Sequence, residues 1–396
     1  MEFLRRTWAE IDLDNLCFNY QSIKKSLSQG SQIMAVVKAD AYGHGDRVVS
    51  RELQRQGVKW FGVSNIEEAL CLRDAGITGE ILILGPTPVE YLTQLCENNI
   101  TQTVHTMEYG KELSAAALAM NTKVKCHFKL DTGMHRIGFD CRDQNVIDNL
   151  EQLYQDKGLQ ATGIFTHFAS ADELSEDGRQ YTFAQFNSFC EVCGKLVGRG
   201  IAVGIRHCCN SAATILYPQM HLDMVRCGIV LYGLDPSVEC KGKAELKPVM
   251  ELYSAVTMVK EIRKGDMISY GRIYTAAENR KIATVAIGYA DGYNRNLSGT
   301  GRMIVNGQYA NVVGRVCMDQ LLLDVTHIPD IKVGDTATIV GSQNGISLSF
   351  DEMAEKSGTI NYEKTCLIGR RVTRVYRKYG ELYEVMSYLR KEEHGI

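Results

Sequence analysis

Short apolar runs alternate with amphipathic, helix-like stretches from Gln32 to Gly233. There are eight such runs: IMAVV before Lys38, WFGVS at Trp60, EILILG at Glu80, TQTVHT at Thr101, VKCHFKLD at Val124, ATGIFTHFA at Ala161, GIRHCCN at Gly204 and DMVRCGIVLYG at Asp223. Near-continuous apolar runs are typical of buried parallel strands. A closed parallel barrel has eight repeats of strand and helix, whereas an open doubly wound sheet usually has fewer strands. The pattern therefore predicts an α/β fold with an N-terminal (β/α)8 barrel of the TIM type.

After Gly233 the sequence pattern changes to strands in which apolar and polar residues alternate and aromatic residues are frequent. Asn306-Gly307 between two apolar runs is a strong hairpin signal. SFDEMAEKSG predicts one helix with Ser349 as N-cap, Glu352 completing a capping box and Gly358 after the last turn. Because a barrel takes about 250 of the 396 residues, we expect a barrel over residues 1–240 and a mainly-β domain over residues 241–396. The stretch WAEIDLDNLCFNYQSIKKSL is expected to cover the barrel's bottom or side.

The composition narrows the class of protein. With 44 basic and 47 acidic residues the net charge is -3, and no basic stripe suggests binding to nucleic acid. No apolar stretch approaches the roughly 20 residues that span a bilayer, and the start lacks a signal peptide, so we expect a cytosolic protein without a membrane partner. The 13 cysteines are odd in number and scattered, which favours reduced thiols over disulfides. No cysteine or histidine grouping has convincing zinc spacing, and no metal is predicted.

Lys38 is the strongest candidate for a reactive residue. It follows an apolar run, and ligands of α/β proteins collect at the carboxyl ends of parallel strands. A lysine desolvated there has a lowered pKa, so that its free amine can attack an aldehyde carbonyl. Tyr42 offers a phenol to a phosphate oxygen, and Gly43 and Gly45 allow a turn close to a ligand. Taken alone, the stretch also fits a solvated lysine after a core strand.

The ends of several other runs carry residues that suit the same ligand. They are Lys129 with the following Arg136, His167, Asn210 with Ser211, and Arg226 with Gly228. Hydroxyls and backbone amides at the late strands of such barrels commonly hold a phosphate, a task that suits Ser211 and Gly228. A phosphate site, an amine that traps aldehydes and charged partners together indicate pyridoxal 5′-phosphate.

These residues lie in motifs that resemble the bacterial alanine racemases from Trp8 to about Tyr376. The motifs are AVVKADAYGHG around Lys38, KLDTGMHRIG from Lys129, THFASAD from Thr166, NSAA from Asn210, HLDMVRCGIVLYG from His221, SYGRIY from Ser269, GYADGY from Gly288, GRVCMDQ from Gly314 and INYE from Ile360. The resemblance implies a pyridoxal phosphate-dependent homodimer of fold type III. Each active site would use residues of both subunits and interconvert L-alanine and D-alanine, which would supply D-alanine for peptidoglycan.

The resemblance also implies catalytic roles. Lys38 would form the Schiff base with the cofactor and act as base on one face of the substrate α-carbon, while Tyr270 would act on the other face. Two opposed bases are needed because a proton removed from one face and delivered to the other inverts the centre. His167 would lie next to Tyr270, with Arg226 behind it. A guanidinium does not readily give its proton to the pyridine nitrogen. The related decarboxylases have a carboxylate in place of Arg226, so the arginine argues against a decarboxylase.

Further roles follow from the same resemblance. Residues implied in binding the cofactor are Lys38, Tyr42, His167, Asn210, Ser211, Arg226, Gly228, Ile229 and Tyr362. Arg136 and the backbone amide of Met318 from the partner chain would hold the substrate carboxylate. Lys129, at a position that is carbamylated in some members, would orient Arg136, and Tyr289 and Asp319 would support the site. For Tyr289 and Tyr362, core packing is the alternative.

Three other functions stay open on the sequence. A serine or broad-specificity amino-acid racemase would use the same two bases, although Tyr362 leaves room for a methyl side chain and so favours alanine. A pyridoxal phosphate-binding regulatory protein would share the barrel but lack the region after about residue 240. A fold-type III decarboxylase is disfavoured by Arg226. His135, Cys208, Cys209 and Cys227 depart from residues common in the family without removing a catalytic group.

Overall fold

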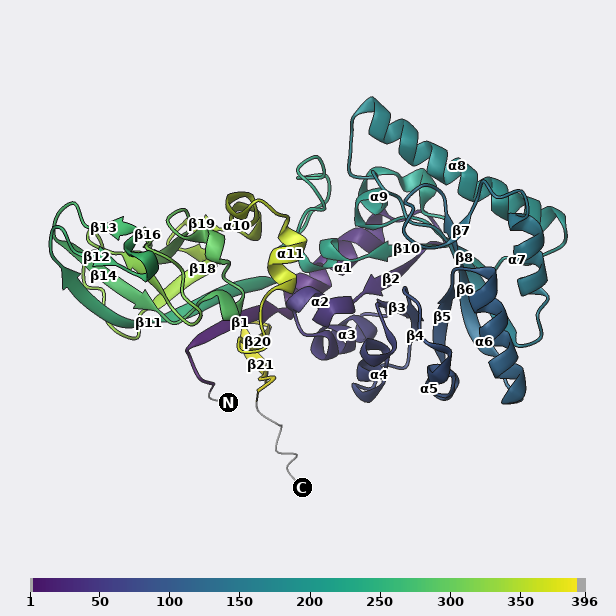
Figure 1. Ribbon diagram of the computed structural model, residues 1–396, viewed down its shortest axis with the longest axis horizontal. Coiled ribbons are helices and arrows are strands. Elements are labelled where there is room, and N and C mark those ends of the chain that lie inside the picture. Colours follow the sequence, from purple (N-terminus) through teal and green to yellow (C-terminus); the bar gives the residue numbers. More distant parts are fainter. Residues whose placement is uncertain (1–2, 390–396) are drawn as a thin grey trace, which may run out of the picture. The chain divides into compact units, whose positions relative to one another are not determined.

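Eight parallel strands form the N-terminal barrel, as the alternation of apolar runs predicts (Figure 1). We describe residues 3–389 of a computed structural model of the chain. The strands are β2 (Gln32–Val36), β3 (Trp60–Val63), β4 (Glu80–Ile83), β5 (Ile100–Val104), β6 (Val124–Asp131), β8 (Leu159–Phe165), β9 (Ile205–His207) and β10 (Met224–Cys227). Their order is β10-β2-β3-β4-β5-β6-β8-β9, with the short β7 (Phe139–Asp140) beside β6. All eight predicted runs therefore lie in one sheet.

Backbone hydrogen bonds bring the two ends of this sheet together. The N–H of Asp223 donates to the carbonyl of Arg206 (3.2 Å), and the N–H of Arg226 donates to that of Cys209 (3.0 Å). The sheet therefore curls until β10 reaches β9, around a core that includes Met34, Trp60 and Phe165. This closure brings the residues that follow β9 next to Arg226.

Helices connect the strands of the barrel. They are α1 (Leu13–Ser26), α2 (Lys38–Gly43), α3 (Asp46–Arg55), α4 (Ile66–Asp74), α5 (Leu92–Glu97), α6 (Met107–Ala119), α7 (Val146–Tyr154), α8 (Glu176–Gly198) and α9 (Ser211–Leu216), with 3-10 turns η1 (Val89–Tyr91), η2 (Pro218–Met220) and η3 (Ile229–Tyr232). Several begin at side-chain caps, because Asn65, Thr106 and Ser175 each accept a backbone N–H of the first turn. None of the helices in residues 3–389 has the length and apolar character needed to cross a membrane.

The C-terminal part is mainly β, as predicted. Its strands are β11 (Met250–Ile262), β12 (Met267–Ile268), β13 (Tyr274–Thr275), β14 (Arg280–Val285), β15 (Arg302–Val305), β16 (Gln308–Val313), β17 (Leu321–Asp324), β18 (Thr336–Gln343), β19 (Ile346–Leu348), β20 (Thr373–Lys378) and β21 (Glu381–Met386). Pairing of β18 with both β15 and β11 closes six strands into a ring, β18-β15-β16-β17-β14-β11. The predicted hairpin joins β15 to β16, with positive φ at Asn306 (48°) and Gly307 (74°).

The N-terminal strand differs from the sequence-based expectation. Residues 7–12 form β1 (Thr7–Asp12), which pairs antiparallel with β11 and parallel with β20 in the C-terminal sheet. The chain accordingly divides into one compact unit of residues 16–41 and 46–247, and another of residues 1–15, 42–45 and 248–396. A single cut at residue 240 does not describe this division. The pairing partners of β1 lie more than 235 positions away, and no local pattern reveals them.

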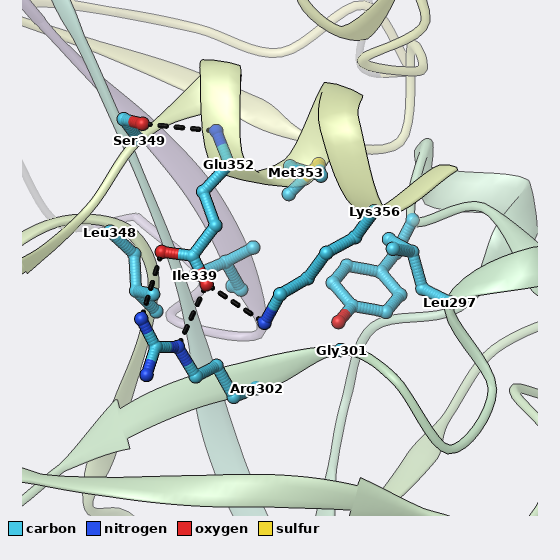
Figure 2. A pocket seen from close by; sticks show the side chains of 10 residues that line it. Leu297, Gly301, Arg302, Ile339, Leu348, Ser349, Glu352, Met353 and Lys356 are labelled. Atoms are coloured by element: carbon cyan, nitrogen blue, oxygen red, sulfur yellow. Dashed lines mark hydrogen bonds and ion pairs between the residues drawn. The ribbon is translucent and has the colours of Figure 1, made fainter. Parts of the chain in front are cut away.

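The predicted helix of the C-terminal unit is α10 (Phe350–Ser357), followed by α11 (Asn361–Cys366) and accompanied by 3-10 turns η4 (Tyr270–Arg272), η5 (Tyr289–Asp291) and η6 (Arg295–Leu297). Ser349 caps α10 by accepting the N–H of Glu352, and Gly358 ends it with φ of 68°. The expected capping box is not what the Glu352 carboxylate forms. Figure 2 shows it bound to Arg302 (2.8 and 3.0 Å) and Lys356 (2.8 Å) at a hollow in this unit that contains none of the predicted site residues.

Candidate active site

Lys38 begins a left-handed turn. The four residues that follow it, Ala39 to Tyr42, have φ between 51° and 56°, and Gly43 continues with 80°. Left-handed backbone costs non-glycine residues roughly 1–2 kcal/mol each, so consecutive ones persist only where surrounding contacts hold them. The sequence predicts a turn bounded by glycines here, but nothing in it indicates that four side-chain-bearing residues adopt this conformation. The turn fixes the direction in which the chain leaves the lysine.

Contacts with the C-terminal strand β20 hold the end of this turn. Arg374 donates from Nε to the carbonyl of Gly43 (3.0 Å), and Tyr376 donates from Oη to the carbonyl of His44 (3.1 Å). A Cβ at Gly43 would lie 2.1 Å from the carbonyl oxygen of Thr365, and one at Gly45 would lie 1.8 Å from Oη of Tyr376. Glycine at both positions is therefore required by close approach as well as by positive φ.

The two tyrosines implied in cofactor binding on this side lie together. The rings of Tyr42 and Tyr362 are 6.1 Å apart at 51°. Tyr42 is buried, and burial raises the pKa of its phenol, so the group stays protonated and can donate a hydrogen bond. Tyr362, on α11, is half-buried.

Arg226 occupies the centre of the barrel site. It is 3% exposed and donates from Nη1 to Nδ1 of His207 (2.9 Å) and from Nη2 toward Nδ1 of His167 (3.2 Å). The carbonyls of Thr166, His207 and Cys208 accept its remaining hydrogen bonds at 2.8–3.1 Å. None of these partners is a carboxylate. Burial lowers the pKa of the guanidinium to about 10, which still leaves it charged at neutral pH.

Charge and burial around Arg226 determine the protonation of its neighbours. His167 is half-buried, and burial together with the charge of Arg226 holds its pKa well below the usual value, so the ring is neutral. Burial and the same charge lower the pKa of Lys129 to about 7, and its ammonium donates to the carbonyl of Leu130 (2.9 Å). Arg136 is exposed and lies close enough to contribute to both shifts. Four of the predicted residues thus interact electrostatically at one end of the barrel.

The predicted phosphate site is formed by the segments that follow β9 and β10. Ser211 Oγ accepts the N–H of Gly228 (3.0 Å), so its own hydroxyl hydrogen can be donated to an anion. Asn210 caps α9 by accepting the N–H of Ala213 (3.0 Å), which fixes the backbone before Ser211. Ile229 is fully buried at the start of η3. This donor set fits a phosphate group.

Tyr270 and Met318 belong to the other unit of the chain. The side chain of Tyr270, in η4, is 69% exposed, and that of Met318 is 51% exposed. Tyr289, 42% exposed, donates its backbone N–H to Cys317 (3.0 Å), and Ala290 donates to the carbonyl of Met318 (3.1 Å). The loops around residues 289 and 318 are therefore one connected structure.

An ion-pair network that no local sequence pattern indicates fixes these two loops. Asp291 is fully buried and accepts from Arg6 Nη1 and Nη2 (2.9 and 3.0 Å) and from the N–H of Gly288 (3.0 Å). It also forms an ion pair with Arg371 Nε (3.2 Å). Arg371 also reaches Asp319 (2.7 Å), whose carbonyl accepts from Arg6 (3.2 Å). These five residues come from four distant segments, and only the motif GYADGY could have drawn attention to Asp291.

Comparison with known proteins decides the family. The model of the alanine racemase N-terminal domain matches residues 11–236, and that of the alanine racemase C-terminal domain matches residues 249–376. The chain belongs to the alanine racemase family. Alanine racemases of Clostridium tetani and Clostridium perfringens are 46% and 44% identical to it over 98% of this chain and 99% of theirs.

Solved structures of alanine racemases are also similar to this chain. The alanine racemase of Clostridium difficile 630 is 41% identical and superimposes with a TM-score of 0.93 over 98% of this chain and 100% of that one. That of Bacillus anthracis with bound L-Ala-P is 37% identical, with a TM-score of 0.92 over 98% and 99% of the two chains. This racemase is thus a pyridoxal phosphate-dependent enzyme with the fold of its family. The Ser211 and Gly228 pair and Lys38 at a barrel strand end suit such a cofactor.

Proposed function

We propose that this chain interconverts L-alanine and D-alanine by a two-base mechanism, with Lys38 and Tyr270 acting on opposite faces of the substrate α-carbon. Lys38 and the Ser211–Gly228 pair would hold pyridoxal 5′-phosphate, with Tyr42, Tyr362, His167, Asn210 and Ile229 around it. When bound, the cofactor withdraws electrons from the α-carbon and so acidifies its hydrogen. The protein's own residues then decide where the proton goes.

Arg226 is the observation that carries the proposal. It is buried among neutral acceptors only, three carbonyls and two imidazoles, and it remains charged. A permanently charged guanidinium does not readily give up a proton to a ring nitrogen, so electron withdrawal stays moderate. This favours returning the proton to the α-carbon and disfavours reactions that need a longer-lived carbanion, such as decarboxylation.

His167 would make Tyr270 a usable base. A tyrosine has an ordinary pKa of about 10 and needs a hydrogen-bond donor that stabilises its phenolate. Nδ1 of His167 faces an N–H of Arg226, so the neutral ring carries its proton on Nε2. That N–H is the donor we propose for the oxygen of Tyr270.

We further propose that Tyr270 and Met318 act in the active site of a second copy of the chain. The exposure of Tyr270 supports this, because a base in water cannot hold a defined position on a substrate. Apolar side chains near it in sequence, Met267 and Ile273, are 55% and 50% exposed, which suits a surface that another chain covers.

The remaining residues would hold the substrate. Arg136 and the backbone N–H of Met318 would bind its carboxylate, with Lys129 orienting Arg136. At neutral pH a lysine whose pKa is about 7 is about half free amine, which is the form that carbon dioxide can carbamylate. Tyr362 would limit the side chain to a methyl, and Tyr289 and Asp319 would support the entrance. We propose supply of D-alanine for peptidoglycan as the role, and the cytosol, where its 13 cysteines stay reduced, as the location. Growth without added D-alanine after loss of the protein, or its recovery outside the cytosol, would contradict these two assignments.

Mixed dimers test the assignment of the bases. Lys38→Ala and Tyr270→Phe are each expected to abolish most racemisation of alanine. When the two variants are co-expressed with different affinity tags, a dimer with one chain of each has one site with both bases. Its kcat per dimer should be about half that of the parent. Mixed dimers as inactive as the single variants would contradict sites shared between chains.

Chiral analysis of L-alanine and L-serine with the parent protein tests the substrate. We expect alanine to reach an equal mixture well before serine. Equal rates would instead indicate a broad-specificity racemase. Bound cofactor without turnover of either would indicate a non-catalytic binding protein.

A further inference from the structure

Two histidines lie in contact in the interior of the barrel, and the proposed mechanism uses neither. His127 on β6 and His207 on β9 are both fully buried, and Nδ1 of His127 lies 2.9 Å from Nε2 of His207. Aromatic rings surround them: Trp60 is 5.3 Å from His127, and Phe165 stacks on His207 at 4.7 Å and 5°. Imidazoles buried among apolar groups are costly unless they are hydrogen-bonded, so this pair calls for an explanation.

The direction of each hydrogen bond follows from Arg226. A guanidinium has only donors, so Nδ1 of His207 must be the acceptor of its 2.9 Å bond. Burial and the charge of Arg226 keep both histidines neutral, which places the single proton of His207 on Nε2. That N–H then donates to His127, whose Nδ1 must be an acceptor and whose own proton lies on Nε2.

The N–H at Nε2 of His127, where this series of hydrogen bonds ends, is buried without an acceptor among the residues that the structure describes. Beside it lies Gly163 of β8, and a Cβ there would be 2.7 Å from both Nε2 and Cε1 of His127. The neighbouring strand therefore leaves space for the ring but gives no acceptor to its proton. An arrangement that leaves a buried donor unsatisfied is retained where the other end of the ring does something useful.

We propose that His127 is a positioning residue for the racemase reaction. By accepting the proton of His207, it keeps the lone pair of His207 directed at Arg226 and so holds the guanidinium where it donates to His167. Without that acceptor the Nε2–H of His207 would be buried without a hydrogen-bond partner, and the ring would lower this cost by moving toward another acceptor. That movement would draw Nδ1 away from Nη1 of Arg226, with which it now makes a bond of 2.9 Å, and Arg226 would shift away from His167. This inference rests on the proposed function of His167 and Arg226.

Substitution of His127 tests the inference in the holoenzyme. His127→Leu keeps a similar volume but removes the acceptor, whereas His127→Asn can place Oδ1 near the position of Nδ1. We expect kcat of His127→Leu to fall about tenfold or more in both directions, with KM for alanine changed less than about threefold. His127→Asn should recover kcat to within about threefold of the parent. Parental kcat in His127→Leu, or equal loss in both variants, would overturn the proposal.

Should His127→Leu fail to fold, the protonation pattern of the unaltered protein decides the proposal.

The protonation pattern can be measured on the unaltered protein without turnover. With 15N-labelled histidine, NMR should show His207 and His127 protonated on Nε2 and not on Nδ1. A proton on Nδ1 of either ring would overturn the proposal. The predicted pattern in a protein that does not racemise alanine would refute the proposed function and leave the protonation assignment standing.

Discussion

Asp291→Asn should destabilise the C-terminal unit strongly, because it removes the buried charge that Arg6 and Arg371 share. The carboxylate is 0% exposed, accepts three hydrogen bonds, from Arg6 and Gly288, and forms an ion pair with Arg371. Breaking a buried ion pair by removing one partner costs about 3–5 kcal/mol. The side chains of Arg6 and Arg371 are 29% and 34% exposed, so water can partly solvate the two guanidinium groups once the carboxylate is removed. The cost should therefore lie at the lower end of this range. We expect the free energy of unfolding to fall by about 3 kcal/mol.

Urea unfolding of the parent, Asp291→Asn and Asp319→Asn measures this difference. Asp319 binds Arg371 in the same network, but its side chain is 56% exposed, so its substitution should cost about 1 kcal/mol or less. Because Ala290 donates to the carbonyl of Met318, Asp291→Asn should also raise KM for alanine more than it lowers kcat. A stability within about 1 kcal/mol of the parent would refute the reasoning that burial makes this carboxylate indispensable.

Two further predictions concern Lys129 and the turn after Lys38. The pKa of Lys129 is about 7 in the folded chain and 10.5 unfolded, so between these values unfolding takes up a proton and this residue makes stability rise with pH by about 1.4 kcal/mol per unit. Lys129→Met should therefore be more stable than the parent, and its advantage in the free energy of unfolding should be larger at pH 7 than at pH 9 in buffer free of carbon dioxide. An advantage that does not change with pH would contradict the lowered pKa of Lys129. Gly43→Ala should cost about 3 kcal/mol or more, because its Cβ meets Thr365 in addition to the strain of positive φ. Gly57→Ala, at φ of 95° with open space around it, should cost about 1 kcal/mol, and equal losses in the two variants would exclude the steric contribution.

The barrel could be predicted because its signals are local. Each of the eight strands is a run of apolar residues, and the rule that ligands collect at strand ends directs attention to Lys38, Lys129 and Arg226 without any knowledge of the fold. The contact between Arg226 and His167 follows once the sheet closes. The hairpin at Asn306-Gly307 and the helix capped by Ser349 were also predicted, because turn and cap chemistry depends on neighbouring residues.

What the sequence did not reveal depends on distant partners. His127 looked like any residue inside a core strand until His207 was found against it, 80 positions away. The left-handed turn at Ala39–Tyr42 is held by Arg374 and Tyr376, without which its residue types give no indication of positive φ. The Glu352 carboxylate does not complete the capping box; it binds Arg302, 50 positions away, together with the neighbouring Lys356.

The place of β1 has a consequence for how the chain folds during synthesis. This strand leaves the ribosome long before its parallel neighbour β20, and Glu10 binds Arg377, 367 positions further along. At about 5–20 residues per second, roughly 20–70 s separate the synthesis of the two strands. The strands of the barrel can pair during this time, but one edge of β1 must wait as an open template for pairing. This strand, from Thr7 to Asp12, is short, and its brevity limits the risk of aggregation while the nascent chain is incomplete.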